Sequence, residues 1–478
     1  MLVILGFGMV AVFMALIMTK RMTPVLALIV VPTIFGLFAG AGLGIGEMAL
    51  EAIGGLAPTA ALLMFAIIYF GVMIDVGLFD PVVRLILRIA GNDPVKVVVG
   101  TALLAAVISL DGDGSTTFIV TTSALLPIYL RLGLSPVVLT CVAGLANGVM
   151  NILPWGGPTA RAAAALDLQA SDVFVPMIPS LLAGIAVVFL FAWHLGVLER
   201  RRLGGSIDDS VVGGTGSTGT GSTGSASRPG RGGRPRGVVI ADQRISTESI
   251  RTLVDDHDTA MADTALDPTR ATLRPQLLWF NTLLTVAVMV LLVLDILPLA
   301  YIFMAASAVA ILVNFPRVKD QAERVVAHAP SIVGVVSMVL AAGVLIGVLE
   351  GTGMVTAMAE WVSASIPSSL GAFSAVITGL LSLPMTFFLS NDAFYFGILP
   401  VLAESAATFG VDPVDMARAS ITGQVVHMQS PLVPAILLLV SLAGVNLGDH
   451  HKKVLWRAVV VSLVMLLVAV LVGSVAIA

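Results

Sequence analysis

Apolar segments long enough to cross a membrane follow one another along most of the chain, separated by short polar stretches. This pattern predicts ten spanning helices, five in each half: residues 1–19, 24–39, 57–78, 137–166, 177–198, 277–294, 301–315, 331–349, 413–442 and 454–478. Each half also holds one further apolar stretch that a polar turn interrupts. We predict a helical hairpin at each of these places, at about 96–131 and at about 370–410.

Landmark residues of the two halves recur at a nearly constant offset. The matched residues are Gly71 with Gly347, Gly77 with Gly353, Pro136 with Pro413, and Pro154 with Pro431. The members of each pair lie 276 or 277 residues apart, which indicates an internal duplication, although common glycines and prolines also align by chance. Five crossings are an odd number, so we predict a first repeat over 1–202 and an inverted second repeat over 275–478.

Lysine and arginine set the orientation, because the loops on one side of the predicted spans carry nearly all of them. Lys96 and Arg131 flank the first hairpin and both belong to this side, which we expect to be cytoplasmic. Hairpin arms of about 15 residues reach about 22 Å, less than a hydrocarbon core of about 30 Å. We therefore predict that the first hairpin enters from the cytoplasm, the second from the other side, and that both tips lie within the membrane.

Composition agrees with a polytopic helical membrane protein: 58% of the 478 residues are hydrophobic, 11% are charged, and the mean hydropathy is +1.03. Residues 203–274, rich in Gly, Ser, Thr and Arg, predict a flexible cytoplasmic linker. The single cysteine, Cys141, leaves no disulfide framework. Phosphate-loop, nucleophile-elbow and metalloprotease motifs are absent from the sequence, so we expect no enzyme, no permanent cofactor and no nucleic-acid partner, in a plasma-membrane protein.

The tip of the first hairpin collects polar residues where ionisable groups are costly and usually functional. They are Asp111, Gly112, Asp113, Gly114, Ser115 and Thr116. Two carboxylates two residues apart repel one another, and repel an organic anion, unless a proton or a cation lies between them. A carboxylate that arrives with protons or with a chelated divalent cation therefore fits, with Asp111 and Asp113 as hard oxygen ligands. Simple helix capping is the alternative.

Prolines and glycines interrupt the helix that follows each hairpin, and the freed backbone groups are tolerated only where they line a cavity. The polar candidates are Asn147, Asn151, Gly156, Gly157, Thr159 and Arg161 in the first half, and Ser390, Asn391, Asp392, Gln424, His427 and Ser430 in the second. Arg161 suits a two-point contact with a carboxylate, or else snorkels to the interface. His427 is a proton carrier or simply bonds a freed carbonyl.

Three strings resemble the signatures of the metal-citrate:proton symporter family, CitMHS, of the ion-transporter superfamily: 109–115 (SLDGDGS), 151–158 (NILPWGGP) and 388–395 (FLSNDAFY). The resemblance implies a scaffold domain that forms a homodimer and a transport domain that moves as an elevator. It also implies proton-driven uptake of citrate complexed with a divalent cation such as Mg, Ca or Fe. Related sodium-coupled carriers have Ser-Asn-Thr at both hairpin tips. This chain has 112–114 or 113–115 and 390–392 there, a departure that puts sodium coupling in doubt.

Our leading hypothesis is a proton-coupled symporter for metal-citrate, in which Asp111, Asp113 and Asp392 contact the metal and Arg161 a carboxylate. A sodium-coupled or exchange carrier for another di- or tricarboxylate is the nearest alternative. A membrane-embedded anion channel or sensor is the alternative of a different class. A sensor should carry a folded output domain, and the composition of 203–274 shows no sign of one.

Overall fold

A computed structural model describes residues 1–19, 21–112, 114–204, 270–294, 296–365 and 367–477. Every regular element in these ranges is helical. By length and composition, six helical segments of the described chain can cross a membrane: Gly42–Asp75, Pro94–Asp111, Ala170–Leu203, Pro275–Leu294, Ala329–Gly351 and Leu447–Leu471. Five shorter apolar helices accompany them. The predicted class, an all-helical polytopic membrane protein, is therefore confirmed.

The first half contains α1 (Leu2–Met18), α2 (Pro24–Phe38), η1 (Gly42–Gly44), α3 (Ile45–Asp75), α4 (Asp80–Ala90), α5 (Pro94–Ile108), η2 (Ser109–Asp111), α6 (Gly114–Arg131), α7 (Pro136–Met150), α8 (Gly157–Ala165), α9 (Ala170–Phe174), η3 (Val175–Met177) and α10 (Ile178–Leu203).

The second half contains η4 (Pro275–Leu277), α13 (Leu278–Leu294), α14 (Leu299–Asn314), α15 (Val318–Ala327), α16 (Ala329–Gly351), α17 (Met354–Ser365), α18 (Ser368–Gly371), α19 (Ser374–Phe388), α20 (Asn391–Gly397), α21 (Leu399–Ala407), α22 (Pro413–Ile421), α23 (Gln424–His427), α24 (Pro434–Leu442) and α25 (Leu447–Leu471). Both halves thus run through two apolar helices, a long helix, a short helix, a helix pair with a tight turn, an interrupted helix and a long last helix.

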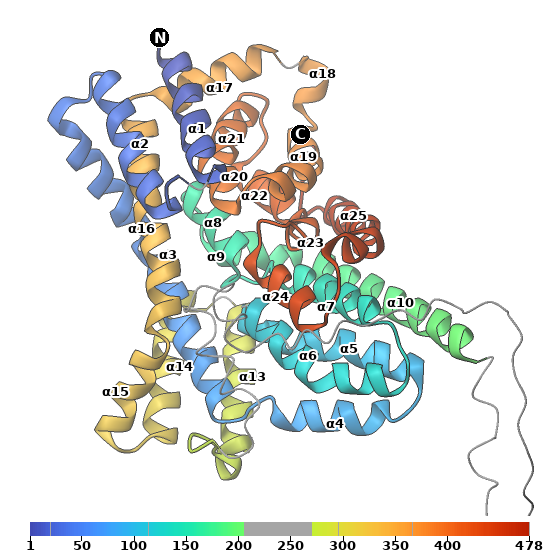
Figure 1. The fold of residues 1–478 in the computed structure, drawn as a ribbon. Helices are drawn as coiled ribbons and strands as arrows, with labels where there is room; N and C mark the ends of the chain where they lie inside the picture. The colour runs from blue at the N-terminus through green and yellow to red at the C-terminus, as the bar shows by residue number, and fades with distance from the viewer. Residues whose placement is uncertain (20, 113, 205–269, 295, 366, 478) are drawn as a thin grey trace, which may run out of the picture.

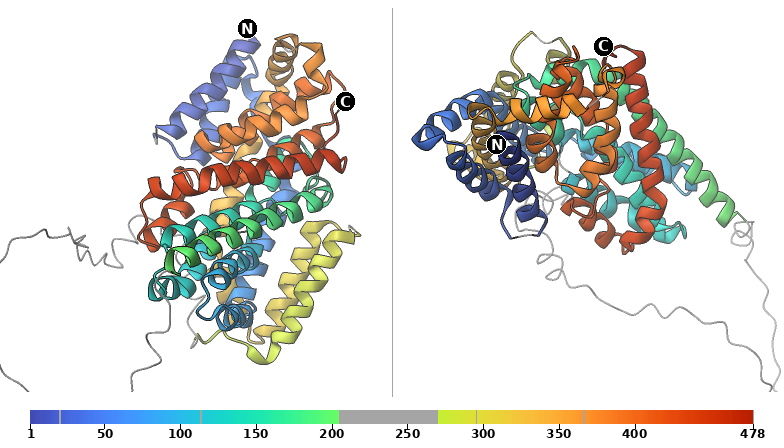
Figure 2. Two further views of the ribbon diagram at one scale, coloured as in Figure 1. Left: turned by 90° about the vertical axis from the view of Figure 1, so that its right-hand side faces the viewer. Right: turned by 90° about the horizontal axis from the view of Figure 1, so that it is seen from above.

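The helices form two groups, which Figure 1 shows side by side. In one group α3 and α16 pack along each other as a long column, with α1 and α2 at one end and α13, α14 and α15 at the other. The other group combines α5 to α10 of the first half with α19 to α25 of the second, and the turned views of Figure 2 show their layered packing. Segments from both halves therefore contribute to each group.

Helix α4 and the start of α3 are among the places where the structure differs from the prediction. Helix α4 is amphipathic, with Val83, Ile86 and Ala90 buried and Arg84 and Arg88 exposed, so its charges hid it from a search for apolar spans. Helix α3 begins at Ile45, twelve residues before the expected span over 57–78, because the helix continues past the apolar stretch into a segment that carries acidic residues.

The predicted linker covers residues 203–274, and its last residues, from Arg270 onward, belong to the described structure. Residues 205–269 lie outside the described part of the chain, but the segment after them packs against the C-terminal end of α3. Arg270 donates hydrogen bonds to the carbonyls of Ile74 and Asp75 and lies 3.0 Å from Asp80 Oδ1. The last carbonyls of a helix lack hydrogen-bond donors within the helix, and Arg270 donates to two of them at the end of α3.

Candidate functional site

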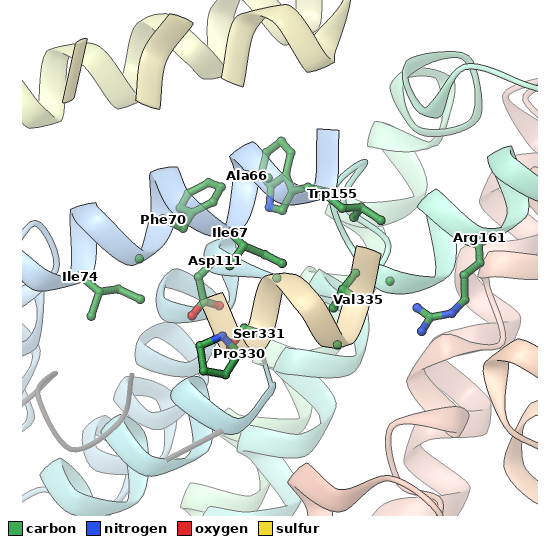
Figure 3. A pocket seen from close by; sticks show the side chains of 15 residues that line it. Ala66, Ile67, Phe70, Ile74, Asp111, Trp155, Arg161, Pro330, Ser331 and Val335 are labelled. Carbon is green, nitrogen blue, oxygen red and sulfur yellow. The ribbon is translucent and has the colours of Figure 1, made fainter. Parts of the chain in front are cut away.

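A cavity of about 250 Å³ lies where the two groups of helices meet (Figure 3). Its walls come from α3, the start of α16, the turn after α5, and the segment that joins α7 to α8. We call it the Arg161 cavity, after the one basic side chain among its lining residues. Figure 3 shows Asp111 between α3 and α16, and Arg161 at the far end with its guanidinium directed toward Val335. A carboxylate and a guanidinium thus face the same space.

The turn after α5 brings Asp111 to the cavity. Asp111 is 9% exposed, and Gly112 follows it with φ +80°, a left-handed conformation that favours glycine. A Cβ atom on Gly112 would also lie 3.1 Å from the ring of Trp155. The indole Nε1 of Trp155 donates to the carbonyl of Leu110 at 2.8 Å, so the turn is held against the segment between α7 and α8.

Asp113 lies outside the described residues, and α6 begins directly after it at Gly114. Ser115 and Thr116 are buried in the first turn of α6. Asn147 of α7 donates from Nδ2 to Ser109 Oγ at 3.0 Å. Its buried Oδ1 has no hydrogen-bond partner among the described residues, and a Cβ on Gly114 would lie 3.2 Å from this oxygen. An unsatisfied amide oxygen therefore faces the tip of the first helix pair.

The interruption after the first helix pair lies where the sequence predicts it, since α7 ends at Met150 and α8 begins at Gly157. A Cβ on Gly156 would come within 2.2 Å of the carbonyl oxygen of Asn151, so only glycine fits this tight crossing of the chain. Thr159 is buried and donates to the carbonyl of Ile152 at 2.7 Å. Thr159 therefore satisfies the interrupted backbone, whereas Gly157 lines the Arg161 cavity.

Arg161 and Asp392 form an ion pair between the two halves of the chain. Arg161 Nε lies 2.6 Å from Asp392 Oδ1, and the side chains are 15% and 9% exposed. Arg161 belongs to α8, and Asp392 to the first turn of α20, where a carboxylate also suits the helix N-terminus. The sequence places both residues among the candidates, and the structure joins them across 231 positions. The guanidinium of Arg161 is therefore held by a carboxylate inside the protein.

Amide side chains meet beside this ion pair. Gln424 and Asn391 exchange two hydrogen bonds, at 3.1 and 3.3 Å, and Gln424 Nε2 also donates to the Tyr395 hydroxyl at 2.9 Å. Asn151 Nδ2 lies 3.5 Å from Gln424 Oε1. Ser390 caps α20 by accepting from the backbone N–H of Ala393 at 3.2 Å. The structure thus brings together candidate residues from the second hairpin tip and from both interrupted helices.

Two predicted site residues have structural contacts instead. His427 Nδ1 donates to the carbonyl of Thr386 at 2.6 Å, and Ser430 Oγ donates to the carbonyl of Phe387 at 2.6 Å. Both bonds satisfy carbonyls at the end of α19, and neither residue lines the Arg161 cavity. For His427, the simpler of the two sequence interpretations, a bond to a freed carbonyl, describes the contact that the structure shows.

Sequence reasoning missed several residues of the cavity wall. Phe70 and Ile74 come from α3, and Pro330 and Ser331 from the start of α16. Trp155 lies inside the interrupted segment between α7 and α8, where the adjacent Gly156 and Gly157 were already candidates, so the sequence did offer a signal for it. The α16 residues carried no local signal, because only packing of distant segments brings the start of this helix to the hairpin tip.

The described residues alone offer no ready-made metal centre. Within the described ranges no group of three or more His, Cys, Asp and Glu side chains is close enough to hold an ion. The oxygen donors near the cavity are carboxylates and an amide, which suit hard cations such as Mg²⁺ or Ca²⁺. A cation here would need further ligands from another molecule.

An all-helical apolar chain whose interrupted helices and tight turns surround a charged cavity has the construction of a membrane transporter. The family comparison makes this specific: the chain belongs to the CitMHS family of citrate transporters, whose family model matches residues 8–423. The resemblance seen in the three sequence strings is therefore confirmed. The family and the relatives are transporters, so the expectation that the chain is not an enzyme is confirmed as well.

Relatives from Bacillus subtilis (strain 168) extend over the whole chain. One named "Citrate transporter" is 47% identical over 474 residues, 99% of both chains. Another, named "Mg(2+)/citrate complex secondary transporter", is 42% identical over 478 residues, 100% of both. Among solved structures, the YdaH transporter of Alcanivorax borkumensis aligns with 89% of this chain and 86% of its own, at 16% identity and a TM-score of 0.45.

Proposed function

We propose that the protein is a secondary active transporter that carries citrate, complexed with a divalent metal cation, in symport with protons. The observation that carries the proposal is the Arg161 cavity, whose lining includes the buried Asp111 and, at its far end, Arg161, which forms an ion pair with Asp392. Free citrate would be repelled by these carboxylates, whereas a complex with a cation presents both signs of charge. The relative named for the Mg(2+)/citrate complex supports this choice of substrate.

Arg161 is the proposed ligand of a citrate carboxylate. Asp392 occupies Nε, and Nη2 contacts the soft sulfur of Met338 at 3.7 Å, so the terminal nitrogens keep donor capacity. A guanidinium binds a carboxylate through two parallel hydrogen bonds, which fixes orientation as well as charge. Asp392 in turn keeps the guanidinium in place when no substrate is bound.

The metal travels as cargo and shares its ligands between protein and citrate. Asp111, which lines the Arg161 cavity, is the first proposed protein ligand of the metal. Asp113 and Asp392 are the other two ligands proposed from the sequence. The unsatisfied Oδ1 of Asn147 is a further oxygen close to the same tip. This ligand set suits Mg, Ca or Fe(II) class cations and requires no permanent cofactor.

Protons complete the charge balance in this proposal. Two neighbouring carboxylates repel one another unless a proton or a cation lies between them, so whichever of Asp111 and Asp113 does not hold the metal is the proposed proton carrier, with His427 as a second candidate. A sodium-coupled or exchange carrier for another di- or tricarboxylate is the competing hypothesis, and the tip sequences argue against it. The comparisons give no support to an anion channel or a sensor.

Alternating access through an inverted repeat and an elevator movement belongs to the same proposal. Left-handed glycines support the repeat: Gly77 (φ +87°) and Gly353 (φ +70°) end α3 and α16, and Gly133 (φ +70°) and Gly410 (φ +82°) end the helix pairs. The column with α3 and α16 would be the scaffold of a homodimer, and the other group of helices the moving domain. We place the protein in the plasma membrane with 203–274 on the cytoplasmic side.

Uptake of labelled citrate into proteoliposomes tests the proposal. We expect uptake with external Mg²⁺ and an inward proton gradient, and no uptake with excess chelator. A sodium gradient should not replace the proton gradient. Unchanged uptake in chelator would refute metal-citrate as the substrate, and uptake driven by sodium alone would favour the competing carrier. Competition by unlabelled di- and tricarboxylates defines the organic ligand.

The carboxylates of the first tip give a matched test in the same assay. Asp111→Asn should reduce uptake on the order of 100-fold, since a metal ligand and a charge are lost together. Glu323→Gln on α15, an exposed carboxylate that does not line the cavity, should leave uptake unchanged. Asp113→Asn should likewise impair uptake far more than Asp209→Asn in the linker. Equal activity of tip and control variants would remove the tip from the mechanism.

A further inference from the structure

A charged, open surface pocket of about 350 Å³ lies between the start of α7 and the start of α25. It is distinct from the Arg161 cavity and shares no lining residue with it. Its lining residues are Ser135, Val137, Asp449, Lys452, Lys453 and Arg457. We call it the α25 cavity, and the transport proposal uses none of its residues.

The α25 cavity has an excess of positive charge. Three of its lining side chains are cationic, and Asp449, 3.5 Å from Lys452 Nζ, is its single carboxylate. The nearby Glu199 is already engaged, because it accepts from the backbone N–H of Ser135 at 3.0 Å and from Arg202 at 2.6 Å. Two cations therefore lack a counter-charge among the lining residues.

Arg457 shows the cost of this arrangement. Arg457 is only 7% exposed, one guanidinium nitrogen donates to the carbonyl of Lys453, and its Cζ lies 4.2 Å from the centre of the Trp456 ring. The buried Nε has no hydrogen-bond partner among the described residues. A buried cation with an unsatisfied N–H is costly, and an anion in the adjacent cavity would offset the positive charge of the guanidinium.

An exposed apolar face continues from the cavity along α25. Trp456, Val460, Leu463 and Leu467 follow Lys452 at steps of four, four, three and four residues, which places them on one side of the helix. All four are exposed. A cationic end with an indole beside it and an aliphatic stripe beyond it matches the division of an amphiphile into headgroup and acyl chain.

We propose that the α25 cavity binds the phosphate group of an anionic phospholipid, with an acyl chain along the exposed face of α25. Lys452, Lys453 and Arg457 neutralise the phosphate, and Trp456 lies at the level of the headgroup. A soluble phosphate would fill the polar part of the site but would leave the apolar face uncovered. The lipid is therefore the occupant that accounts for both features.

The thermal stability of the full-length purified protein tests this proposal. Phosphatidylglycerol or phosphatidylcholine is added in detergent, and inorganic phosphate or glycerol 3-phosphate is added in parallel. We expect the melting temperature to rise with the phosphatidylglycerol concentration and then to saturate, by mass action. Phosphatidylcholine, inorganic phosphate and glycerol 3-phosphate should each need a concentration at least roughly tenfold higher for the same rise. Equal protection by phosphatidylcholine would refute a charge-specific lipid site. Equal protection by the soluble phosphates would show an anion site without a lipid.

Variants locate the effect. Lys452→Gln/Lys453→Gln removes two cations without emptying a buried position and should weaken the apparent affinity for phosphatidylglycerol roughly tenfold or more. Lys319→Gln on α15, an equally exposed lysine on another surface, should leave the affinity unchanged. Arg457→Gln tests the buried cation, and native mass spectrometry counts the retained lipid in each variant. Full lipid retention by the double variant would overturn the proposal.

Discussion

Two cavities lie at opposite ends of the short helix α8, and they differ in charge. The Arg161 cavity is lined by Gly157 and Arg161 from the start of α8. Another cavity, of about 440 Å³, is lined by Ala164, Ala165 and the following Asp167 at the end of α8. Glu51 of α3 and Glu350 of α16 also line it, none of its lining residues is basic, and we call it the acidic cavity.

The same three helices build both cavities from opposite ends. The C-terminal half of α3 and the start of α16 line the Arg161 cavity, whereas the N-terminal part of α3 and the end of α16 line the acidic cavity. Between the cavities α8 is buried and consists largely of alanine, so its surface there is smooth and small. The comparison teaches that the basic residue proposed to bind substrate lies at one end of α8 only, and that the lining of the cavity at the other end is acidic.

This asymmetry fits the proposed alternating access. A guanidinium holds a carboxylate, so citrate can be held in the Arg161 cavity, whereas three carboxylates attract cations and repel free citrate. Movement of α8 and the hairpin tips relative to α3 and α16 would expose Arg161 toward the acidic cavity. The following changes test whether the two cavities have these different roles.

The largest effect should follow Arg161→Gln. It removes the proposed citrate ligand and leaves Asp392 without its ion-pair partner, so citrate uptake should fall on the order of 100-fold or more. Stability should fall by about 3 kcal/mol, because the carboxylate stays largely buried. Uptake and the melting temperature of the purified protein measure the two losses.

Two companion variants separate binding from stability. Arg161→Gln/Asp392→Asn should recover much of the stability but none of the uptake, since no uncompensated charge remains. Arg161→Lys keeps the charge but loses the planar fork and should stay at least roughly tenfold impaired. Normal uptake by a stable Arg161→Gln protein would show that the Arg161 cavity does not bind the carboxylate.

The next largest effect should follow Gly156→Ala, which tests the tight crossing that starts α8 beside the Arg161 cavity. The new Cβ would lie 2.2 Å from the oxygen of Asn151 and 2.8 Å from that of Leu153, so the backbone must shift. We expect a loss of stability of about 3 kcal/mol, with uptake strongly reduced. Gly54→Ala is the control, because nothing lies within 4 Å of its Cβ, and it should stabilise α3 by about 0.5–1 kcal/mol. Equal effects of the two changes would mean that the interruption is not sterically tight.

The features that the sequence predicted well depend on local rules. Glycine and proline mark tight turns and helix interruptions within a few residues, so the position of Asp111 after α5 and the interruption between α7 and α8 were both expected. The long apolar helices were also expected, since length and hydropathy define them. The sequence analysis missed the amphipathic helix α4, because α4 is too short and too charged to meet the criterion of length and hydropathy.

The features that the sequence did not predict depend on distant packing. The pairing of Arg161 with Asp392 joins two halves of the chain, and no local pattern selects this partner over another carboxylate. Ser331 reaches the Arg161 cavity only because α16 packs along α3. Ser430 has a hydroxyl group that could bind a ligand, and in the structure this hydroxyl donates to a carbonyl at the end of α19. The sequence alone does not show which partner the hydroxyl has.

A smaller effect should follow neutralisation of the acidic cavity. Glu51→Gln/Glu350→Gln lowers its negative charge, so at low ionic strength the Mg²⁺ concentration for half-maximal uptake should rise by roughly two- to fivefold. The maximal rate should not change, because Arg161 and Asp111 are intact. Raising the salt concentration should remove the difference, as expected for attraction of cations from solution. A lower maximal rate with no shift in Mg²⁺ dependence would instead place binding groups in the acidic cavity.

The smallest effect should come from an ion pair that belongs to neither cavity. Asp93 caps α5, and Arg200 of α10 lies 2.6 Å from its carboxylate. Partial burial by itself would raise the pKa of Asp93, but hydrogen bonds from Arg200 and the Val95 N–H, with the charges of Arg200 and Lys96, outweigh it and hold the pKa below its usual range. The pair should contribute about 0.2–1 kcal/mol at neutral pH, since both side chains are partly solvated.

The pH dependence of this pair follows from the lowered pKa. A carboxyl group whose folded pKa is depressed stabilises the fold above its unfolded pKa of about 3.9, and this contribution is lost as the pH falls through the folded pKa. Arg200→Gln should therefore lower the melting temperature slightly at pH 7, and the difference from the unmodified protein should shrink toward pH 3. Uptake should be unaffected at neutral pH. A loss of uptake as large as that of the Arg161 variants would show that surface charge alone explains the effects assigned to the two cavities.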